Sequence, residues 1–552
     1  MTQVLNFKEN SKKIAQHFLQ SVVAVDDNIR FEPRPVVDEG ELEVPDDTGL
    51  GELEDKNDDK AIKFLDHGLY YQDLSHEFAR KGIICGGFSP KQGDLDSSID
   101  AVVNTSKNSD ITILDWQMEV AEADGKFATD VIKKISELDR SEGGRTRLIC
   151  IYTAKDTEAV ADTLKNSLKF LKPKLQSCTI TFSALNLTHW KIEVVNKGDI
   201  QEIALCDYLV DSFTALTTGL LSNAALASIA AIRDNTHHLL HKFSSGLDTA
   251  YLSHVLGLIS SPDMREQANE VAFDYAVDLI SEELKSELQI SQIVKNSLSK
   301  EVLETWPKHM SPRNKAPRFK IKMGQEQVEF NNETMKKLLL ASTEEELISV
   351  LENNLKLKGI GDKSTLDIFN KALIQLSFDN YNTEPLLDFC SLESTRRNLL
   401  TLKDHIPVLK QGTLIKEKTK NKYYLCIQPI CDTVRLKTGY HNFTFLETSI
   451  SNSDFTHVMR KTGGHLKLKI TPSAKNIRTI HFLANDDKKA VLSIINETRI
   501  PEFSSGSIEK PVLYEWCGEF KFTISQAVVN GLAAQLARVG LDSFEWLRQK
   551  QK

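Results

Sequence analysis

Short apolar runs alternate with amphipathic stretches through the first 210 residues, and this alternation limits the folds open to the chain. The apolar runs, each too short for a helix, lie at Val22–Val25, Gly82–Gly86, Ile111–Leu114, Leu148–Tyr152, Cys178–Phe182 and Lys191–Val195. Helical spacing of apolar residues falls between them, near Tyr70–Lys81, Leu95–Asn104, Phe127–Leu138 and Thr157–Leu171. Strands that alternate with amphipathic helices build a parallel sheet covered on both faces. We therefore expect an α/β domain over residues 1–205.

Two further regions follow this domain. Residues 206–306 keep the apolar spacing of helices throughout, so we expect an all-α region there. A basic, proline-containing linker at 308–317 separates it from residues 318–552, where we expect an α+β region. Its predicted elements are a helix near Thr343–Leu357 capped by Ser342, a hairpin of Thr413–Lys418 with Tyr423–Pro429, strands at Leu466–Ile470 and Phe520–Ile524, and a helix at Gln526–Arg548.

The net charge of the 552-residue chain, −9, resides in one segment. Eleven acidic residues and one base lie between Asp38 and Asp59, and the other 530 residues carry a net charge of +1. A chain this balanced gives no reason to expect a nucleic-acid partner. The segment lacks apolar periodicity, so we interpret it as a solvated acidic insertion over residues 31–60. The alternative is an acidic lid, or a docking arm for a basic partner, close to a site at the preceding strand end.

Cysteine spacing and hydropathy indicate a protein of the reducing cytoplasm. The eight cysteines form no Cys-x-x-Cys pair, which argues against zinc and disulfides. Residues 1–10 contain no signal-peptide core, so we expect a cytoplasmic location. Ser212–Ile232 spans 21 residues without a charge, but its seven polar side chains favour a buried helix over a membrane span.

Polar residues end the apolar runs at one edge of the expected sheet. Asp26 and Asp27 end the first run, Asp115 the third and Thr153 the fourth, and Lys197 follows the last. Ligands bind at the carboxyl ends of the strands in such sheets. Three clustered carboxylates require a cation, and all-oxygen ligation suits Mg²⁺. A hydroxyl and an amine can hold the oxygens of a transferring phosphoryl group. The set therefore predicts Mg²⁺-dependent phosphoryl transfer to Asp115.

These motifs resemble the receiver domain of two-component response regulators. The matching segments are Val22–Asp27, Ile111–Met118, Asp124-Gly125, Ile151–Ala154 and Val194–Lys197. The resemblance covers Ser21–Leu216 and implies a flavodoxin-like fold, whose parallel sheet is five-stranded and doubly wound. It also implies roles for the strand-end residues: Mg²⁺ binding by Asp26, Asp27, Asp115 and the main-chain carbonyl of Gln117, phosphoryl binding by Thr153 and Lys197, and catalysis by Asp115, the phosphoacceptor for a histidine kinase, with Lys197.

The sequence departs from the receiver pattern in ways that leave alternatives open. An additional extended segment and a loop precede Lys197, and the lysine-proline step of receivers is Lys197-Gly198 here. Lys155 is therefore a competing candidate for the phosphoryl-binding lysine. The switch aromatic of receivers has no clear match, with Trp190 and Phe182 as candidates.

Two clusters outside these motifs admit both a functional and a structural interpretation. His237, His238 and His241 cluster in one helix, where His237 and His241 share a face at i and i+4, but no third metal ligand is evident. We therefore interpret the cluster as polar residues of a helix surface or a dimer seam. The four lysines of Lys416–Lys422 could touch a nucleic-acid backbone, but a solvated hairpin tip is the favoured interpretation.

The overall organisation leaves more than one class of function open. A receiver with an inserted loop and a large C-terminal region resembles the response receiver proteins of bacterial anti-phage defence loci, most closely those of the Detocs type. This resemblance implies a partner histidine kinase and a separate receiver-bearing effector enzyme. Because no catalytic motif is evident after the receiver, we expect a signalling protein rather than an enzyme, which acts as a phosphate sink or through a phosphorylation-controlled partner interaction. The alternatives are a DNA-binding response regulator that reads DNA through residues 310–552, and an enzyme with an unfamiliar site. A homodimer through the helical region is a further expectation, and no membrane partner is expected.

Overall fold

The computed structural model describes residues 6–34, 68–309, 318–359, 364–377, 384–506 and 511–536, apart from short gaps at 92, 119–120, 122, 185, 263, 266–267, 324–325, 371–372, 403–404, 462 and 498. The acidic segment Asp38–Asp59 lies outside the described residues, so its interpretation stays a prediction. The chain forms two compact units: residues 1–248 with 275–378, and residues 249–274 with 379–552. The three-part division expected from the sequence also stays a prediction.

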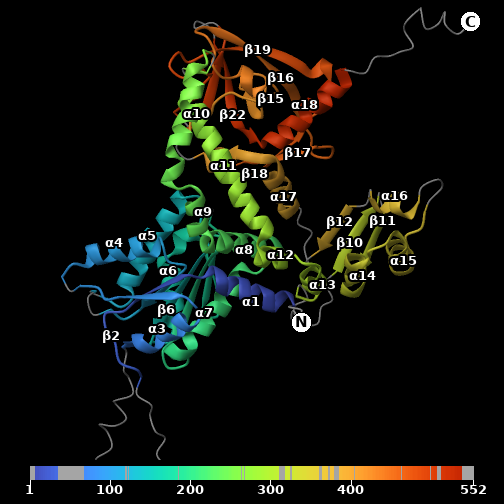
Figure 1. The fold of residues 1–552 in the computed structure, drawn as a ribbon. Coiled ribbons are helices and arrows are strands. Elements are labelled where there is room, and N and C mark those ends of the chain that lie inside the picture. The colour runs from blue at the N-terminus through green and yellow to red at the C-terminus, as the bar shows by residue number, and fades with distance from the viewer. Residues whose placement is uncertain are drawn as a thin grey trace, which may run out of the picture. The chain divides into compact units, whose positions relative to one another are not determined.

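A seven-stranded sheet with helices on both faces forms the start of the first unit (Figure 1). Its strand order is β4-β1-β5-β6-β9-β8-β7. The first five strands of this order are parallel: β4 (Ile84–Phe88), β1 (Ser21–Val25), β5 (Ile111–Asp115), β6 (Arg147–Thr153) and β9 (Trp190–Asn196). The expected five-stranded, doubly wound parallel sheet is confirmed.

An antiparallel hairpin extends this sheet beyond β9. It consists of β7 (Pro173–Gln176) and β8 (Thr179–Phe182), and β8 pairs antiparallel with β9. The extended segment predicted at Cys178–Phe182 is therefore real, but it is an addition at the sheet edge rather than part of the parallel core. The predicted helix Thr157–Leu171 ends early, because α6 (Thr157–Ser167) gives way to a short 3-10 turn at Lys169–Leu171.

Alternating side chains of the strands form two separate cores. On one face, Val23 and Val25 belong to a core with α4 (Leu95–Ser106), α5 (Lys126–Ser141) and α6. On the other, Val22 and Ala24 pack with α1 (Phe7–Phe18), α3 (Tyr71–Arg80) and α7 (Glu202–Thr217). Helix α1 was not predicted, because only a few apolar residues line its buried face. Its N-terminus is capped by the Asn6 side chain, which accepts from the Glu9 N–H at 3.0 Å.

The expected all-α region is present but is more divided than predicted. Its helices are α8 (Leu220–Asp234), α9 (Thr236–Lys242), α10 (Asp248–Ser260), α11 (Ala268–Ile290), α12 (Gln292–Ser297) and α13 (Lys300–His309). Ser212–Ile232 is not one helix, since the chain breaks between α7 and α8. The Thr218 hydroxyl donates to the Thr214 carbonyl at 2.6 Å, and extended backbone at Gly219 starts the next helix. Among the described helices, none is both long and apolar enough to cross a membrane.

A small three-stranded antiparallel sheet follows, in the order β11-β10-β12. Its elements are β10 (Arg318–Met323), β11 (Glu326–Phe330), α14 (Asn332–Leu340), α15 (Glu344–Asn354), α16 (Thr365–Asn370) and β12 (Leu373–Ser377). The predicted cap of α15 is wrong by one residue. The Thr343 hydroxyl accepts from the Glu346 N–H at 3.2 Å, whereas the Ser342 N–H donates to the Glu346 carboxylate at 2.8 Å. Ser342 and Thr343 both make hydrogen bonds at the start of α15. Sequence spacing alone does not show which of the two caps the helix.

The second unit is dominated by a ten-stranded antiparallel sheet. Its elements are α17 (Glu384–Ser394), β13 (Thr395–Asn398), β14 (Thr413–Glu417), β15 (Lys422–Cys426), β16 (Tyr440–Ile450), β17 (His457–Lys461), β18 (Gly464–Lys469), β19 (Ile477–Leu483), β20 (Ile494–Ile495), β21 (Pro501–Ser505), β22 (Val512–Phe520) and α18 (Phe522–Leu536). Pairing of β21 with β22 closes six strands into a ring around Phe445, Phe482 and Trp516.

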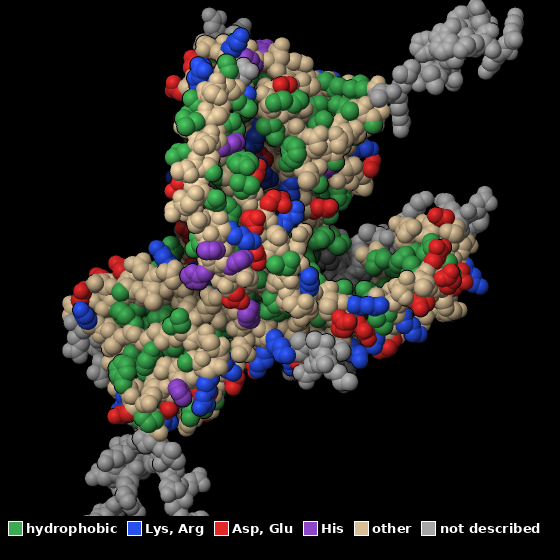
Figure 2. Space-filling model, viewed as in Figure 1, with side chains coloured by type: hydrophobic (Ala, Val, Ile, Leu, Met, Phe, Trp, Pro, Cys, Tyr) green, Lys and Arg blue, Asp and Glu red, His purple; other side chains and the backbone are tan. Residues whose placement is uncertain are grey.

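The predictions for this unit are partly confirmed. The hairpin of β14 and β15 and the strand β18 lie where the sequence places them. The strand predicted at Phe520–Ile524 is wrong, because β22 ends at Phe520 and α18 begins at Phe522. Its Phe-Lys-Phe alternation straddles the strand end and the helix start. Figure 2 shows acidic and basic side chains interspersed on the displayed surface, as expected for a chain whose charge balances outside the acidic segment.

A buried ion pair joins α5 to β6 in the first unit. The Arg147 Nε donates to Asp139 Oδ2 at 2.7 Å, and its Nη2 donates to Oδ1 at 2.8 Å. The Arg147 Nη1 donates to the Ser106 carbonyl at 2.8 Å, and the Trp190 indole donates to Asp139 at 3.1 Å. Breaking one partner of such a pair leaves an uncompensated buried charge.

We expect Arg147→Met to lower the free energy of unfolding by about 3–5 kcal/mol, because Asp139 stays buried without its cation. Urea denaturation followed by circular dichroism measures the loss. The double variant Arg147→Met with Asp139→Leu is the control, and it should regain most of the stability. A loss of only about 1 kcal/mol in the single variant, as for an exposed pair, would contradict the expectation.

Candidate functional site

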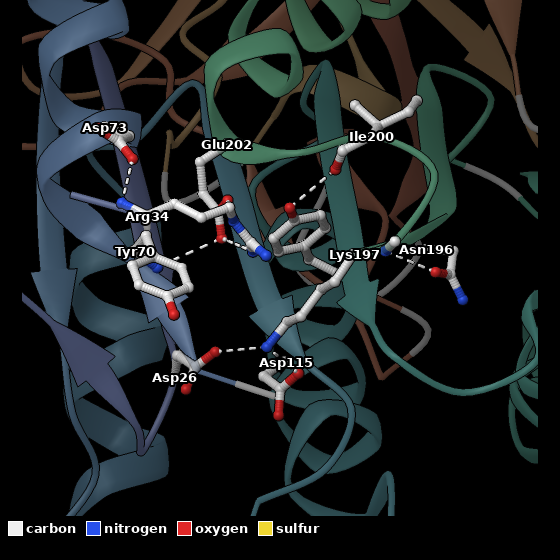
Figure 3. Close-up of polar contacts among 11 residues, drawn as sticks. Asp26, Arg34, Tyr70, Asp73, Asp115, Asn196, Lys197, Ile200 and Glu202 are labelled. Atoms are coloured by element: carbon white, nitrogen blue, oxygen red, sulfur yellow. Dashed lines mark hydrogen bonds and ion pairs between the residues drawn. The ribbon is translucent and has the colours of Figure 1, made fainter. Parts of the chain in front are cut away.

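The carboxyl end of the parallel sheet holds a lysine between two carboxylates, as Figure 3 shows. Asp26 follows β1, Asp115 ends β5, and Lys197 follows β9. The Lys197 Nζ lies 2.9 Å from Asp26 Oδ2 and 3.0 Å from Asp115 Oδ1. All three side chains are almost fully buried. The sheet therefore brings together residues that lie up to 171 positions apart in the chain.

Backbone pairing fixes the two flanking residues of the site. The Asp26 N–H donates to the Phe88 carbonyl at 3.2 Å, which extends the pairing of β1 with β4 by one residue. The Asp26 carboxylate also accepts from the Asn28 N–H at 2.8 Å. The Lys197 N–H donates to the Thr153 carbonyl at 2.8 Å and so extends the pairing of β9 with β6. Both residues directly follow a strand and continue its backbone pairing by one residue, which fixes where their side chains start.

Asp27 completes a group of three carboxylates. One oxygen from each of Asp26, Asp27 and Asp115 lies within 4.8 Å of the others. Among the described residues, this is the one group of three acidic, histidine or cysteine side chains close enough to hold a metal ion. An all-oxygen, partly buried donor set of this charge fits Mg²⁺, which binds a few carboxylates and keeps several waters.

The pKa of the Asp115 carboxyl is raised to about 7, and burial is the largest cause. The neighbouring Lys197 lowers this pKa, while the charges of Asp26 and Asp27 contribute to raising it. Burial lowers the pKa of Lys197, but the two carboxylates outweigh it, so that the lysine pKa lies above its usual value. The site thus has an excess of negative charge that one ammonium group does not fully compensate, as expected for a cation-binding site.

Two further predicted residues lie on the β6 side of the site. Thr153, the last residue of β6, is completely buried, and its hydroxyl accepts from the Lys155 N–H at 3.0 Å. The Lys155 side chain is half exposed, and its Nζ lies 3.8 Å from Asp124. The structure therefore places Lys197, not Lys155, in contact with the Asp115 carboxylate.

Gly198 explains how the loop after Lys197 is held without the proline of the receiver pattern. The Gly198 N–H donates to the Asn196 side-chain oxygen at 2.7 Å, and the Asn196 amide donates to the Lys155 carbonyl at 3.0 Å. Proline has no N–H and could not make the first of these bonds. The turn after Lys197 is therefore fixed by these hydrogen bonds instead of by the ring of a proline.

The loop after Asp115 is closed by a glycine and an aromatic ring. The Gly125 N–H donates to the Trp116 carbonyl at 2.8 Å, and Gly125 has a φ of +74°. A Cβ atom at this position would lie 2.1 Å from the Trp116 ring, so only glycine fits. Gln117, the predicted carbonyl ligand, lies within this loop and is half-buried. Its role as a ligand stays a prediction.

Sequence reasoning missed a second polar cluster beside the site (Figure 3). The Arg34 guanidinium makes two hydrogen bonds to the buried Glu202 carboxylate, at 3.0 and 3.1 Å, and lies 4.5 Å from the Tyr70 ring centroid. The Tyr70 N–H also donates to Glu202, at 3.3 Å. The one sequence signal is an acidic residue at the start of α7, and nothing pairs it with an arginine 168 positions earlier.

The aromatic switch candidates lie away from the strand-end site. Trp190 is the first residue of β9, whereas Lys197 follows the last residue of this strand. Trp190 therefore lies at the amino end of the parallel strands, opposite the carboxyl end that holds the site. It packs edge-to-face on Phe182 at a centroid distance of 6.0 Å. Its contacts make it part of the buried cluster around Arg147 and Asp139.

The remaining candidate clusters have ion-pair partners. His238 Nε2 lies 3.8 Å from Glu287, and the adjacent Lys242 lies 3.2 Å from the same carboxylate. Each lysine of the β14–β15 hairpin has a glutamate partner: Lys416 with Glu515 at 3.5 Å, Lys418 with Glu502 at 2.8 Å, Lys420 with Glu417 at 2.9 Å and Lys422 with Glu447 at 2.7 Å. These pairs support the structural interpretation of the hairpin.

Comparison with known proteins identifies the part of the chain that carries the site. A family model described as the response receiver domain matches residues 18–202, which include the acidic triad, Thr153 and Lys197. A search of curated proteins and a search of solved structures found no match. The family match, the strand order and the acidic triad agree, and residues 18–202 are a response receiver domain.

Proposed function

We propose that the protein is a phosphoacceptor of response-regulator type, which receives a phosphoryl group on Asp115 in an Mg²⁺-dependent reaction. The observation that carries this proposal is the bridge of Lys197 between Asp26 and Asp115 within the acidic triad. A buried carboxylate flanked by an ammonium group and by two further carboxylates is suited to charge-compensated phosphoryl transfer. Asp26 and Asp27 would hold the ion with Asp115 and the Gln117 carbonyl.

The transfer needs a nucleophile and donors for the phosphoryl oxygens. A carboxylate oxygen of Asp115 attacks the phosphorus of a donor phosphohistidine, and the P–N bond breaks as the O–P bond forms. The electron pair of the broken bond stays on the leaving imidazole nitrogen. The Lys197 ammonium and the Thr153 hydroxyl supply hydrogen-bond donors to the transferred group. Bound Mg²⁺ would neutralise the negative charge that the carboxylates and the phosphoryl group bring together.

The biological role follows from the resemblance of the organisation to defence-associated receiver proteins. We infer a cytoplasmic signalling protein of the Detocs type, phosphorylated by a partner histidine kinase and acting as a phosphate sink or as a phosphorylation-controlled partner of a receiver-bearing effector enzyme. Support comes from the receiver domain and its complete acidic site. The DNA-binding alternative gains no support from the β14–β15 hairpin, because its lysines are paired with glutamates.

We expect the full-length protein to form an acid-stable, base-labile acyl phosphate when incubated with a small phosphodonor and Mg²⁺. Asp115→Asn should abolish this label, because the nucleophilic oxygen is lost, and Asp27→Asn should reduce it, because one metal-binding carboxylate is lost. Intact mass spectrometry and base treatment measure the product. Undiminished labelling of Asp115→Asn would reject Asp115 as the phosphoacceptor.

Replacing the two candidate lysines separates their roles. Lys197→Met should slow phosphorylation about 100-fold, the order of magnitude for loss of one preorganised donor. Lys155→Met should leave the rate unchanged, because that side chain faces Asp124 at 3.8 Å. Single-turnover phosphotransfer rates test both. A large effect of Lys155→Met with none of Lys197→Met would transfer the assignment to Lys155.

Mg²⁺ binding should strengthen as pH rises through 7. Burial raises the Asp115 pKa to about 7, so that a proton competes with the ion below this pH and has left the site above it. Mg²⁺ titrations followed by tryptophan fluorescence between pH 5 and 8 measure the effect, since Trp116 adjoins Asp115. The Asp115→Asn variant is the control and should lose this pH dependence. An affinity that is constant over the range in the wild-type protein would contradict the assignment.

A further inference from the structure

Tyr152 lies in the path by which the Lys197 side chain reaches Asp115. Strand β6, which carries Tyr152, lies between β5 and β9 in the sheet. Backbone pairing places Tyr152 opposite Asp115 on one side and opposite Val195 on the other. Paired residues of neighbouring strands point to the same face of a sheet, and so does Lys197, two residues after Val195. The Lys197 side chain therefore crosses β6 on the face that carries the Tyr152 ring.

The Lys197 ammonium lies over the Tyr152 ring, with 5.5 Å between Nζ and the ring centroid. An aromatic face attracts a cation at this distance, and the attraction is stronger where water is excluded. Both side chains are almost fully buried, and Tyr152 is only 1% exposed. Contacts from Tyr152, Asp26 and Asp115 thus hold the ammonium group, and Figure 3 shows the two carboxylate contacts.

The Tyr152 hydroxyl holds the turn that follows Lys197. It donates to the Ile200 carbonyl at 2.8 Å, and the Ile200 N–H donates to the Asn196 carbonyl at 3.1 Å. The pKa of Tyr152 lies well above its usual value, with burial as the largest cause and the Glu202 carboxylate as the next. The hydroxyl therefore stays protonated and remains a donor at physiological pH. One side chain thus contacts both the Lys197 ammonium and the backbone of the turn.

We propose that Tyr152 is a positioning residue, which directs the Lys197 ammonium toward the phosphoryl group on Asp115. This inference rests on the proposed role of Asp115 as the phosphoacceptor. A lysine side chain is a flexible stem with a compact charge, so contacts from neighbouring groups must fix its direction. The Asp26 contact is shared with the ion, because Asp26 is also a candidate ligand. The ring has no oxygen on its face with which to bind Mg²⁺, so its contact with Lys197 does not compete with the ion.

A purely structural role is the alternative for Tyr152, because it belongs to the buried core that the sheet forms with α7. Loss of a core side chain lowers the stability of the fold without acting on any one residue of the site. A positioning role acts through Lys197, so the effect of removing the ring must disappear once the lysine is absent. A double-mutant cycle between the two residues separates these roles.

Phosphorylation rates of the full-length protein with acetyl phosphate and Mg²⁺ test the proposal. Tyr152→Leu should lower the rate about tenfold, because the ring contact with a desolvated cation is lost. The same change in the Lys197→Met background should lower the rate less than about twofold. Tyr152→Phe keeps the ring and should restore most of the rate that Tyr152→Leu loses.

Phe213→Leu is the matched control. It removes a buried ring from the same core, where Phe213 stacks on Phe18 at a centroid distance of 5.9 Å. This variant should lose stability but keep the phosphorylation rate of the wild type. Circular dichroism and thermal unfolding establish that each variant is folded. If Tyr152→Leu does not fold, Tyr152→Met replaces it in the cycle, because the longer flexible side chain fills more of the same space.

An equal loss of rate in the wild-type and Lys197→Met backgrounds would overturn the proposal and leave Tyr152 as a core residue. So would an unchanged rate in Tyr152→Leu, or an equal loss of rate in Phe213→Leu. Failure of the proposed function has a different signature, since Asp115→Asn would then still be labelled. Loss of the label in Asp115→Asn together with independent effects of Tyr152 and Lys197 would reject the positioning role alone.

Discussion

The ammonium group of Lys197 makes the acidic edge of the receiver sheet possible. Three carboxylates at the ends of two neighbouring strands repel each other, and burial removes the water that would screen them. A single lysine that reaches both Asp26 and Asp115 offsets part of this cost. It also leaves the site short of positive charge, which is the electrostatic condition for binding a divalent cation. Stability and chemistry therefore depend on the same contact.

The contact of Lys197 with Asp26 and Asp115 depends on the order of the strands in the sheet rather than on a local sequence motif. Lys197 is separated from β6 in sequence by a helix, a hairpin and a loop, yet β9 pairs directly with β6. The β7–β8 hairpin adds to the outer edge of β9, so the extra residues do not displace the fifth parallel strand. The additional residues before Lys197, which made its assignment from the sequence uncertain, thus form a hairpin at the outer edge of the sheet. The hydrogen bond of Gly198 to Asn196 then fixes the turn.

The sequence predicted the parallel strands, their covering helices and the acidic triad, because each of these depends on local periodicity or on the common edge of a parallel sheet. Its failures share a different physical origin. Helix α1 has only three apolar residues on its buried face, which is a weak apolar period, and the break at Gly219 depends on a single extended residue rather than on a change of period. The alternation of apolar and polar residues at Phe520–Ile524 predicted a strand wrongly, because β22 ends at Phe520 and α18 begins at Phe522. The pair of Arg34 with Glu202 joins distant segments through complementary charge, for which one sequence provides no signal.

That distant pair has a consequence for how the domain can vary. Ile29 and Arg30 pair with Leu69 and Tyr70, and Arg34 is bonded to Glu202 next to Tyr70, so the described residues on the two sides of positions 35–67 lie close together. The entropy of closing a loop grows only slowly with its length. Residues between these anchors can therefore be lengthened, shortened or recharged without moving Asp26, which makes this position a natural point for inserting or exchanging sequence within an otherwise constrained receiver.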